Sequence, residues 1–149
     1  VTISMIRKYR DKNWNWCDLS KNPGISWEMI KNNPDLPWDF FDGVVQNPNL
    51  TWEDVKNSNI EWNWKLLSLN KNITFEIIKE NPDKPWSWSY FSRNPNLTID
   101  IIRNNPNIPW NWNLISLNNF EVYEKKIIKN VISDFLLGDI VDLVLRYSN

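Results

Sequence analysis

The chain has 149 residues, enough for one domain with a sizeable core, and its 17 Lys and Arg nearly balance its 18 Asp and Glu. A net charge of −1 gives no strong field toward nucleic acid or anionic membranes, and no apolar run approaches the ~20 residues that span a bilayer, so we expect a soluble protein without either partner. One cysteine and no histidine exclude intrachain disulfides, thiolate zinc clusters and histidine-based catalysis. We therefore expect an intracellular protein that is not an enzyme and needs no cofactor or metal.

A tryptophan recurs along the chain every 24 residues, and the residue two positions later is also tryptophan except after Trp38, where it is Phe40. We call the first member of each pair the leading tryptophan: Trp14, Trp38, Trp62, Trp86 and Trp110. An interval of this size is typical of stacked repeats. It divides residues 1–118 into a half repeat (1–13), four repeats (14–37, 38–61, 62–85 and 86–109) and the start of a fifth (110–118).

The first half of each repeat predicts a short helix, which we call helix A. It reads Trp-x-Trp-x-x-(Leu/Phe/Ile)-Ser, as at Trp62 to Ser68, with apolar spacing that fits a helix better than a strand. Prolines precede three of the leading tryptophans and suit the first helical turn: Pro37, Pro85 and Pro109. Asn-Pro pairs are expected to end the helix.

The second half of each repeat predicts another short helix, helix B. It opens with Ser or Thr as N-cap, then a large apolar residue, then a carboxylate near the positive end of the helix dipole. These carboxylates are Glu28, Glu53, Glu76 and Asp100, and we interpret them as helix-dipole partners and not as catalytic or calcium ligands. The expected buried pairs are Trp27 with Ile30, Trp52 with Val55, Phe75 with Ile78, and Ile99 with Ile102.

Helices this short are marginal on their own, so each repeat must bury its apolar face against its neighbours. The sequence therefore predicts an all-α fold, an α-solenoid of two-helix 24-residue repeats. Repeat 2 lengthens its first half by one residue within 41–45 and shortens its second half by one, which keeps Trp62 in register. Residues 119–149 lose the repeat and are predicted to form a helical C-terminal cap, whose surplus apolar face is a candidate dimer contact.

The chain opens inside a repeat, because Thr2 stands 12 residues before Trp14 as Ser26 stands before Trp38. It also begins with Val, and we expect the natural protein to carry more sequence upstream. Without a preceding neighbour, Ile3, Met5 and Ile6 would be exposed.

The repeated unit Pro-Trp-x-Trp-x-x-Leu-Ser-x-Asn-Pro-Asn-(Ile/Leu)-Thr, as at 85–98, resembles the Trp-rich tandem repeats of proteins encoded by giant DNA viruses. The 24 asparagines agree with this resemblance, which covers residues 2–118. It implies a helical-repeat fold and a viral protein in the host-cell cytoplasm or the virion. It carries over no catalytic residue.

The candidate partner-binding residues are the second member of each tryptophan pair and the asparagines between the two: Trp16, Trp64, Trp88, Trp112, Asn15, Asn63 and Asn111. Residues i and i+2 of a helix point about 200° apart, so one tryptophan of a pair is expected inside and the other at the surface. An exposed ladder of this kind would bind an extended peptide, with amides on its backbone and indoles forming side-chain pockets. The alternative is that both tryptophans only pack between helices. Base stacking of single-stranded nucleic acid is disfavoured because basic residues are scattered.

Most other polar positions have a structural interpretation. The asparagines before the prolines, such as Asn47 and Asn94, are expected to satisfy helix ends and turns, and Cys17 to be a buried thiol. The sequence favours a scaffold that binds a protein or peptide. The alternatives are a structural component that self-associates through the ends of the solenoid or the cap, and an enzyme with one nonrepeating cleft.

Overall fold

The computed structural model describes residues 1–118, which belong to two compact units, Val1–Ile73 and Thr74–Asn149. All regular secondary structure in this described range is helical, which confirms the predicted all-α fold. The predicted cap, residues 119–149, lies outside the described residues.

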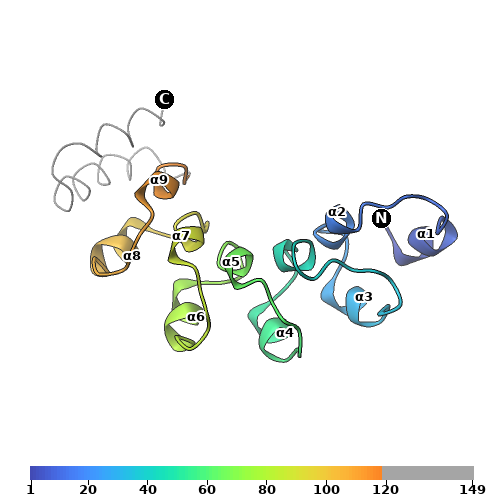
Figure 1. Cartoon of the computed structure of the whole chain (residues 1–149), viewed down its shortest axis with the longest axis horizontal. Helices are drawn as coiled ribbons and strands as arrows, with labels where there is room; N and C mark the ends of the chain where they lie inside the picture. Colours follow the sequence, from blue (N-terminus) through green and yellow to red (C-terminus); the bar gives the residue numbers. More distant parts are fainter. Residues whose placement is uncertain (119–149) are drawn as a thin grey trace. The chain divides into compact units, whose positions relative to one another are not determined.

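The first unit alternates helices from the two halves of the repeat. Its elements are α1 (Ile3–Lys8), α2 (Trp16–Ser20), α3 (Trp27–Lys31), the 3-10 helix η1 (Val44–Gln46), α4 (Trp52–Lys56) and α5 (Trp64–Leu67). Figure 1 shows α1, α3 and α4 in one row and α2, η1 and α5 in a second row. Helix A and helix B therefore form separate layers within this unit.

The second unit follows the same order in its described part. Its helices are α6 (Phe75–Glu80), α7 (Trp88–Phe91), α8 (Ile99–Asn104) and α9 (Trp112–Ile115). In Figure 1, α6 and α8 belong to one layer and α7 and α9 to the other.

The predicted starts of helix B are confirmed. In each helix the hydroxyl of the N-cap accepts a hydrogen bond from the backbone N–H three residues on; the caps are Thr2, Ser26, Thr51, Thr74 and Thr98. Each predicted carboxylate lies in the first turn, and Glu28, Glu53 and Asp100 also pair with the basic residue three positions later. The predicted apolar pairs are buried, except for Trp52, which is half-buried. On α1, Ile6 is buried, contrary to the expected exposure, whereas Met5 is exposed.

Helix A begins two residues later than predicted. Its first residue is the second tryptophan of the pair, and the residue between the two tryptophans is the N-cap, as Ser87 is for α7. Pro85 therefore stands before the cap and not in the first helical turn, so that prediction was wrong. The argument from two tryptophans on one helix was wrong for the same reason, because the leading tryptophan precedes the helix.

Repeat 2 has no α-helix in its first half, contrary to the prediction. Asp39 occupies the N-cap position, and its carboxylate accepts hydrogen bonds from the N–H groups of Phe41 and Asp42. The inserted residue widens the turn, so that the N–H of Val44 donates to the Asp39 carbonyl and only the 3-10 helix η1 follows. Gly43 allows this close path, since a Cβ there would lie 2.6 Å from the Ser20 Cβ.

Buried asparagine amides join consecutive repeats. The Nδ2 of Asn47 donates to the carbonyls of Ser20, Asn22 and Ile25 in the preceding repeat, at 2.7 to 3.3 Å. Its Oδ1 accepts from the N–H of Asn49, whose own amide donates to Pro23 and Ile25. The same pattern recurs at Asn70, Asn72 and Asn118. The structural role predicted for Asn47 is confirmed, but Asn47 binds the preceding repeat as well as its own turn.

Candidate partner-binding surface

The leading tryptophans close the turn between two repeats. The indole N–H donates to the carbonyl five residues earlier: Trp14 to Tyr9, Trp38 to Asn33, Trp86 to Asn81 and Trp110 to Asn105, at 2.8 to 3.0 Å. In repeat 2, whose second half lacks the prolines of the other repeats, Trp62 donates to the Ser58 hydroxyl instead. The acceptor carbonyl follows helix B, and the tryptophan must stand five residues after it to form this bond. This requirement explains why the leading tryptophan keeps its 24-residue register.

The second tryptophans are half-buried, and Trp16 and Trp88 pack against the next repeat. Trp16 meets the ring of Trp38 edge to face at 5.6 Å, and Trp88 meets Trp110 in the same way at 5.8 Å. Phe40, the natural replacement in repeat 2, contacts Trp62 at 6.4 Å. A phenylalanine therefore serves the packing role at this position.

What tryptophan adds at this position is an indole N–H. In the described part of the chain, the indole N–H groups of Trp16, Trp88 and Trp112 donate no hydrogen bond, in contrast to those of the leading tryptophans. Because these three side chains are only half-buried, the donors remain accessible from outside.

The three candidate asparagines act as N-caps of helix A. The Oδ1 atoms of Asn15, Asn63 and Asn111 accept from the N–H groups of Asp18, Leu66 and Leu114, respectively. Two of the amide nitrogens are also engaged: that of Asn15 with the Asp18 carboxylate, and that of Asn111 with the Ser89 hydroxyl. Their predicted contact with a peptide stays a prediction.

A pocket of about 330 Å³, the Lys84 pocket, lies beside Trp88 in the second unit. It is lined by Phe75, Ile78, Lys79, Pro82, Lys84, Trp86, Trp88, Asn105 and Ile108. A pocket of about 230 Å³, the Lys12 pocket, lies beside Trp16 in the first unit. Six residues of its lining stand three repeats before residues that line the Lys84 pocket. They are Ile6, Arg10, Lys12, Trp14, Trp16 and Leu36, and their counterparts are Ile78, Pro82, Lys84, Trp86, Trp88 and Ile108. Both pockets therefore use the same position of the repeat.

Neither pocket was predicted from the sequence, although a signal was present. Lys12 and Lys84 stand where the other repeats have Leu36, Ile60 and Ile108. Both lysines follow an aspartate and pair with it, at 3.4 Å for Asp11 and 2.8 Å for Asp83. The hydrogen bond from Lys84 lowers the pKa of Asp83, which favours the ionised carboxylate.

Next to the Lys12 pocket, Arg7 holds the carboxylate of Asp35. Its two guanidinium nitrogens donate to the two oxygens of Asp35 at 2.8 and 2.9 Å, and one of them also reaches the Asn33 amide oxygen. This contact lowers the pKa of Asp35. Each oxygen of Asp35 therefore already accepts one hydrogen bond where this residue lines the pocket.

The thiol of Cys17 is half-buried beside Asp42, and its sulfur donates to that carboxylate at 3.7 Å. Desolvation raises the pKa of Cys17, which favours the neutral thiol over the reactive thiolate. Partial burial of Asp39 opposes its ionisation, but the N–H groups of Asp42, Phe41 and Gly43 outweigh it and lower the pKa of Asp39. The raised pKa of Cys17 and the lowered pKa of Asp39 both fit structural roles for these residues.

These observations define an all-α protein built from tandem 24-residue repeats of short helices. Comparison of the chain with protein-family models, curated proteins and solved structures finds no match. Within residues 1–118, no helix has the length and apolar character needed to cross a membrane. In the same range, no three His, Cys, Asp or Glu side chains are grouped so that they could hold a metal ion.

Proposed function

We propose that the chain is a non-enzymatic scaffold, an α-solenoid of viral origin, that binds another protein or an extended peptide through its second tryptophans. The observation that carries this proposal is the accessible indole N–H at equivalent positions of three repeats, Trp16, Trp88 and Trp112. A half-buried indole with an unused donor offers apolar contact area and one directed hydrogen bond, which is why tryptophan is frequent at protein interfaces.

The repeat itself supplies a rigid support for this surface. Trp88 follows the N-cap Ser87 and contacts the ring of Trp110, and the residue before Trp112 donates its backbone N–H to the Ser92 hydroxyl of the preceding repeat. A preorganised side chain loses little conformational entropy when a partner binds.

The proposal is tested by affinity capture from the producing cell with a variant in which Trp16, Trp64, Trp88 and Trp112 are changed to Phe. Phe40 shows that the chain uses phenylalanine at this position, so the variant is expected to fold. The control is Met29→Ala with Phe41→Ala, which removes two exposed apolar side chains elsewhere. We expect the tryptophan variant to lose partners that the wild type and the control retain. Equal capture by all three would overturn the proposal.

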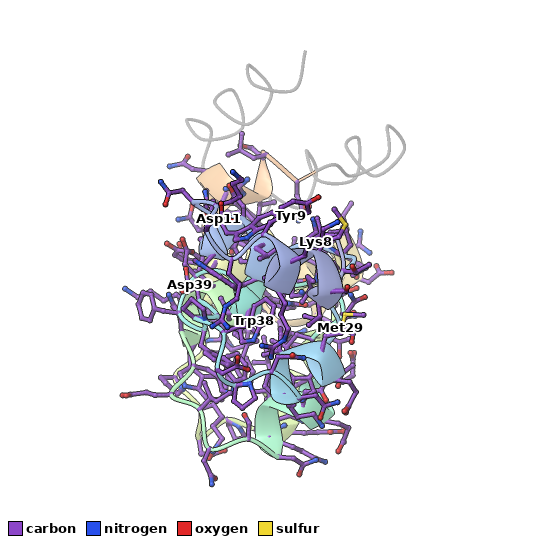
Figure 2. All side chains as sticks on the ribbon, turned by 90° about the vertical axis from the view of Figure 1, so that its right-hand side faces the viewer. Lys8, Tyr9, Asp11, Met29, Trp38 and Asp39 are labelled. Atoms are coloured by element: carbon purple, nitrogen blue, oxygen red, sulfur yellow. The ribbon has the colours of Figure 1, made fainter. Side chains whose placement is uncertain are left out.

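Self-association is a second candidate, favoured by exposed apolar side chains at α1. Met5 is 45% exposed and Tyr9 40% exposed, and Figure 2 shows Tyr9 near Lys8 at the surface of the first unit. Light scattering over a concentration series decides this: a monomer at every concentration would exclude self-association through this face.

A further inference from the structure

The Lys12 and Lys84 pockets differ from the rest of the repeat array in carrying a cation beside a tryptophan pair. Other repeats have an aliphatic residue at the position of Lys12 and Lys84. One of these residues, Leu36, is buried. A lysine there keeps its ammonium group in contact with water, and the Lys12 side chain is 66% exposed. The Lys84 side chain is 40% exposed.

The pockets present hydrogen-bond donors almost without acceptors. In the Lys84 pocket the donors are Lys79, Lys84 and the indole of Trp88, and the side-chain acceptor is the amide oxygen of Asn105. The Asn105 amide nitrogen is turned away and donates to the Ile101 carbonyl. A ligand that fits three donors must bring acceptors, and an ionised carboxylate brings acceptors only.

The Lys12 pocket repeats this chemistry. Its donors are Arg10, Lys12 and the indole of Trp16, and the one carboxylate in its lining, Asp35, is occupied by Arg7. Each pocket therefore combines two cations with a free indole N–H. The aspartates paired with the lysines reduce the local charge but leave it positive, in a chain whose net charge is −1.

Stacking of nucleic-acid bases does not fit the tryptophan in the Lys84 pocket. The ring of Trp88 already contacts Phe75, Phe91 and Trp110, at centroid distances of 5.8 to 6.3 Å. Base binding requires an open aromatic face, whereas Trp88 contributes an indole N–H and apolar contact.

We propose that the Lys84 pocket and the Lys12 pocket each bind a glutamate or aspartate side chain of an extended peptide. The carboxylate accepts from the lysine and from the indole N–H of Trp88 or Trp16, and the aliphatic part of the ligand lies against the tryptophan pair. This inference rests on the function proposed above and names the chemistry of the partner. A peptide side chain fits better than a small inorganic anion, because the lining also offers apolar surface, as at Phe75, Ile78 and Trp88.

The test is a titration of the full chain, labelled with ¹⁵N, with a short capped peptide of repeating Gly-Glu-Leu. The indole N–H signals of Trp16 and Trp88 are assigned with Trp16→Phe and Trp88→Phe and followed in ¹H–¹⁵N spectra. Matched titrations use the Gly-Gln-Leu peptide, acetate and single-stranded oligothymidylate. The pocket variants are Lys84→Leu and Lys12→Leu, which place the residue type of Leu36 at the pocket lysine, and Lys84→Arg, which keeps the cation.

We expect the Glu peptide to shift both indole signals and to bind more tightly than the Gln peptide. Lys84→Leu should weaken binding at Trp88 by about fivefold and leave Trp16 unaffected, whereas Lys84→Arg should retain it. Lys65→Leu, which removes an exposed cation outside both pockets, should change neither signal.

Equal binding of the Glu and Gln peptides at these indoles would overturn the acidic-side-chain inference and leave the peptide-binding function standing. Acetate or oligothymidylate binding as tightly as the Glu peptide would also overturn the inference. If no peptide shifts either indole, the inference fails, while loss of cellular partners in the tryptophan variant would still support the scaffold function.

Discussion

The side-chain amide of Asn47 donates a 2.7 Å hydrogen bond to the backbone carbonyl of Ser20, in the preceding repeat, and both residues are almost fully buried. The same nitrogen lies 3.0 Å from the Ile25 carbonyl. One asparagine therefore satisfies the Ser20 carbonyl at the end of the short helix α2 and a carbonyl of the turn that follows.

We predict that Asn47→Leu lowers the free energy of unfolding by about 3 kcal/mol, because the buried Ser20 carbonyl and the Asn49 N–H lose their side-chain partner. Urea denaturation followed by circular dichroism measures this. The control is Asn32→Leu, at an exposed position where the side chain makes no hydrogen bond within the described residues. A loss of similar size in both variants would contradict the role given to Asn47.

The stabilities of Trp38→Phe and Trp16→Phe can be compared directly, because the two rings contact each other. Trp38→Phe removes the 2.9 Å bond to the Asn33 carbonyl, and Trp16→Phe removes an indole N–H that bonds nothing in the described range. We expect Trp38→Phe to cost about 1 kcal/mol more stability than Trp16→Phe, since it loses a hydrogen bond that Trp16→Phe does not. Thermal unfolding of both variants checks this, and equal losses would count against the distinction between leading and second tryptophans.

Gly43→Ala should destabilise the first unit by about 2 kcal/mol, because the added Cβ would meet Ser20 and two backbone carbonyls within 3 Å. Gly24→Ala is the control, since its Cβ would meet only the Asn22 side chain at 3.1 Å and the Val1 carbonyl at 3.8 Å. Comparison of the two melting temperatures tests whether the turn in repeat 2 packs on the preceding repeat as described. An unaffected Gly43→Ala variant would exclude this packing.

The ion pair of Asp35 and Arg7 makes the stability of the fold depend on pH. The pKa of Asp35 is lowered in the folded state, so its stabilising contribution is present above the pKa of the unfolded chain and is lost as the pH falls through the folded-state pKa. We expect Asp35→Asn to melt below the wild type at pH 7, with the difference vanishing at strongly acidic pH. A difference that is constant with pH would contradict the assignment.

The sequence predicted helix B well and helix A less well, for a physical reason. Helix B carries its start signal locally, with a hydroxyl N-cap followed by a carboxylate, as in Ser26 and Glu28. In helix A the cap is an asparagine or serine between two large aromatics, and Pro85 offered a competing start three residues before Trp88. The proline was interpreted as part of the helix although Ser87 was the better cap.

The bonds between repeats could not be read from local patterns. Asn47 binds carbonyls 22 to 27 residues earlier, and a propensity argument within one turn has no access to such partners. The recurrence of asparagines two residues apart, at Asn47 and Asn49 and again at Asn70 and Asn72, was the available signal. The pocket lysines were missed because a solvated charge is the ordinary interpretation of Lys84.

Exchange of the indole protons is the most direct test of the central claim that leading tryptophans are structural and second tryptophans are available to a partner. Hydrogen exchange at the resolved indole signals measures protection for each ring. The account predicts strong protection for Trp38 and Trp110, whose N–H groups are bonded and buried, and fast exchange for Trp16 and Trp88. Protection of Trp16 and Trp88 equal to that of Trp38 would contradict it.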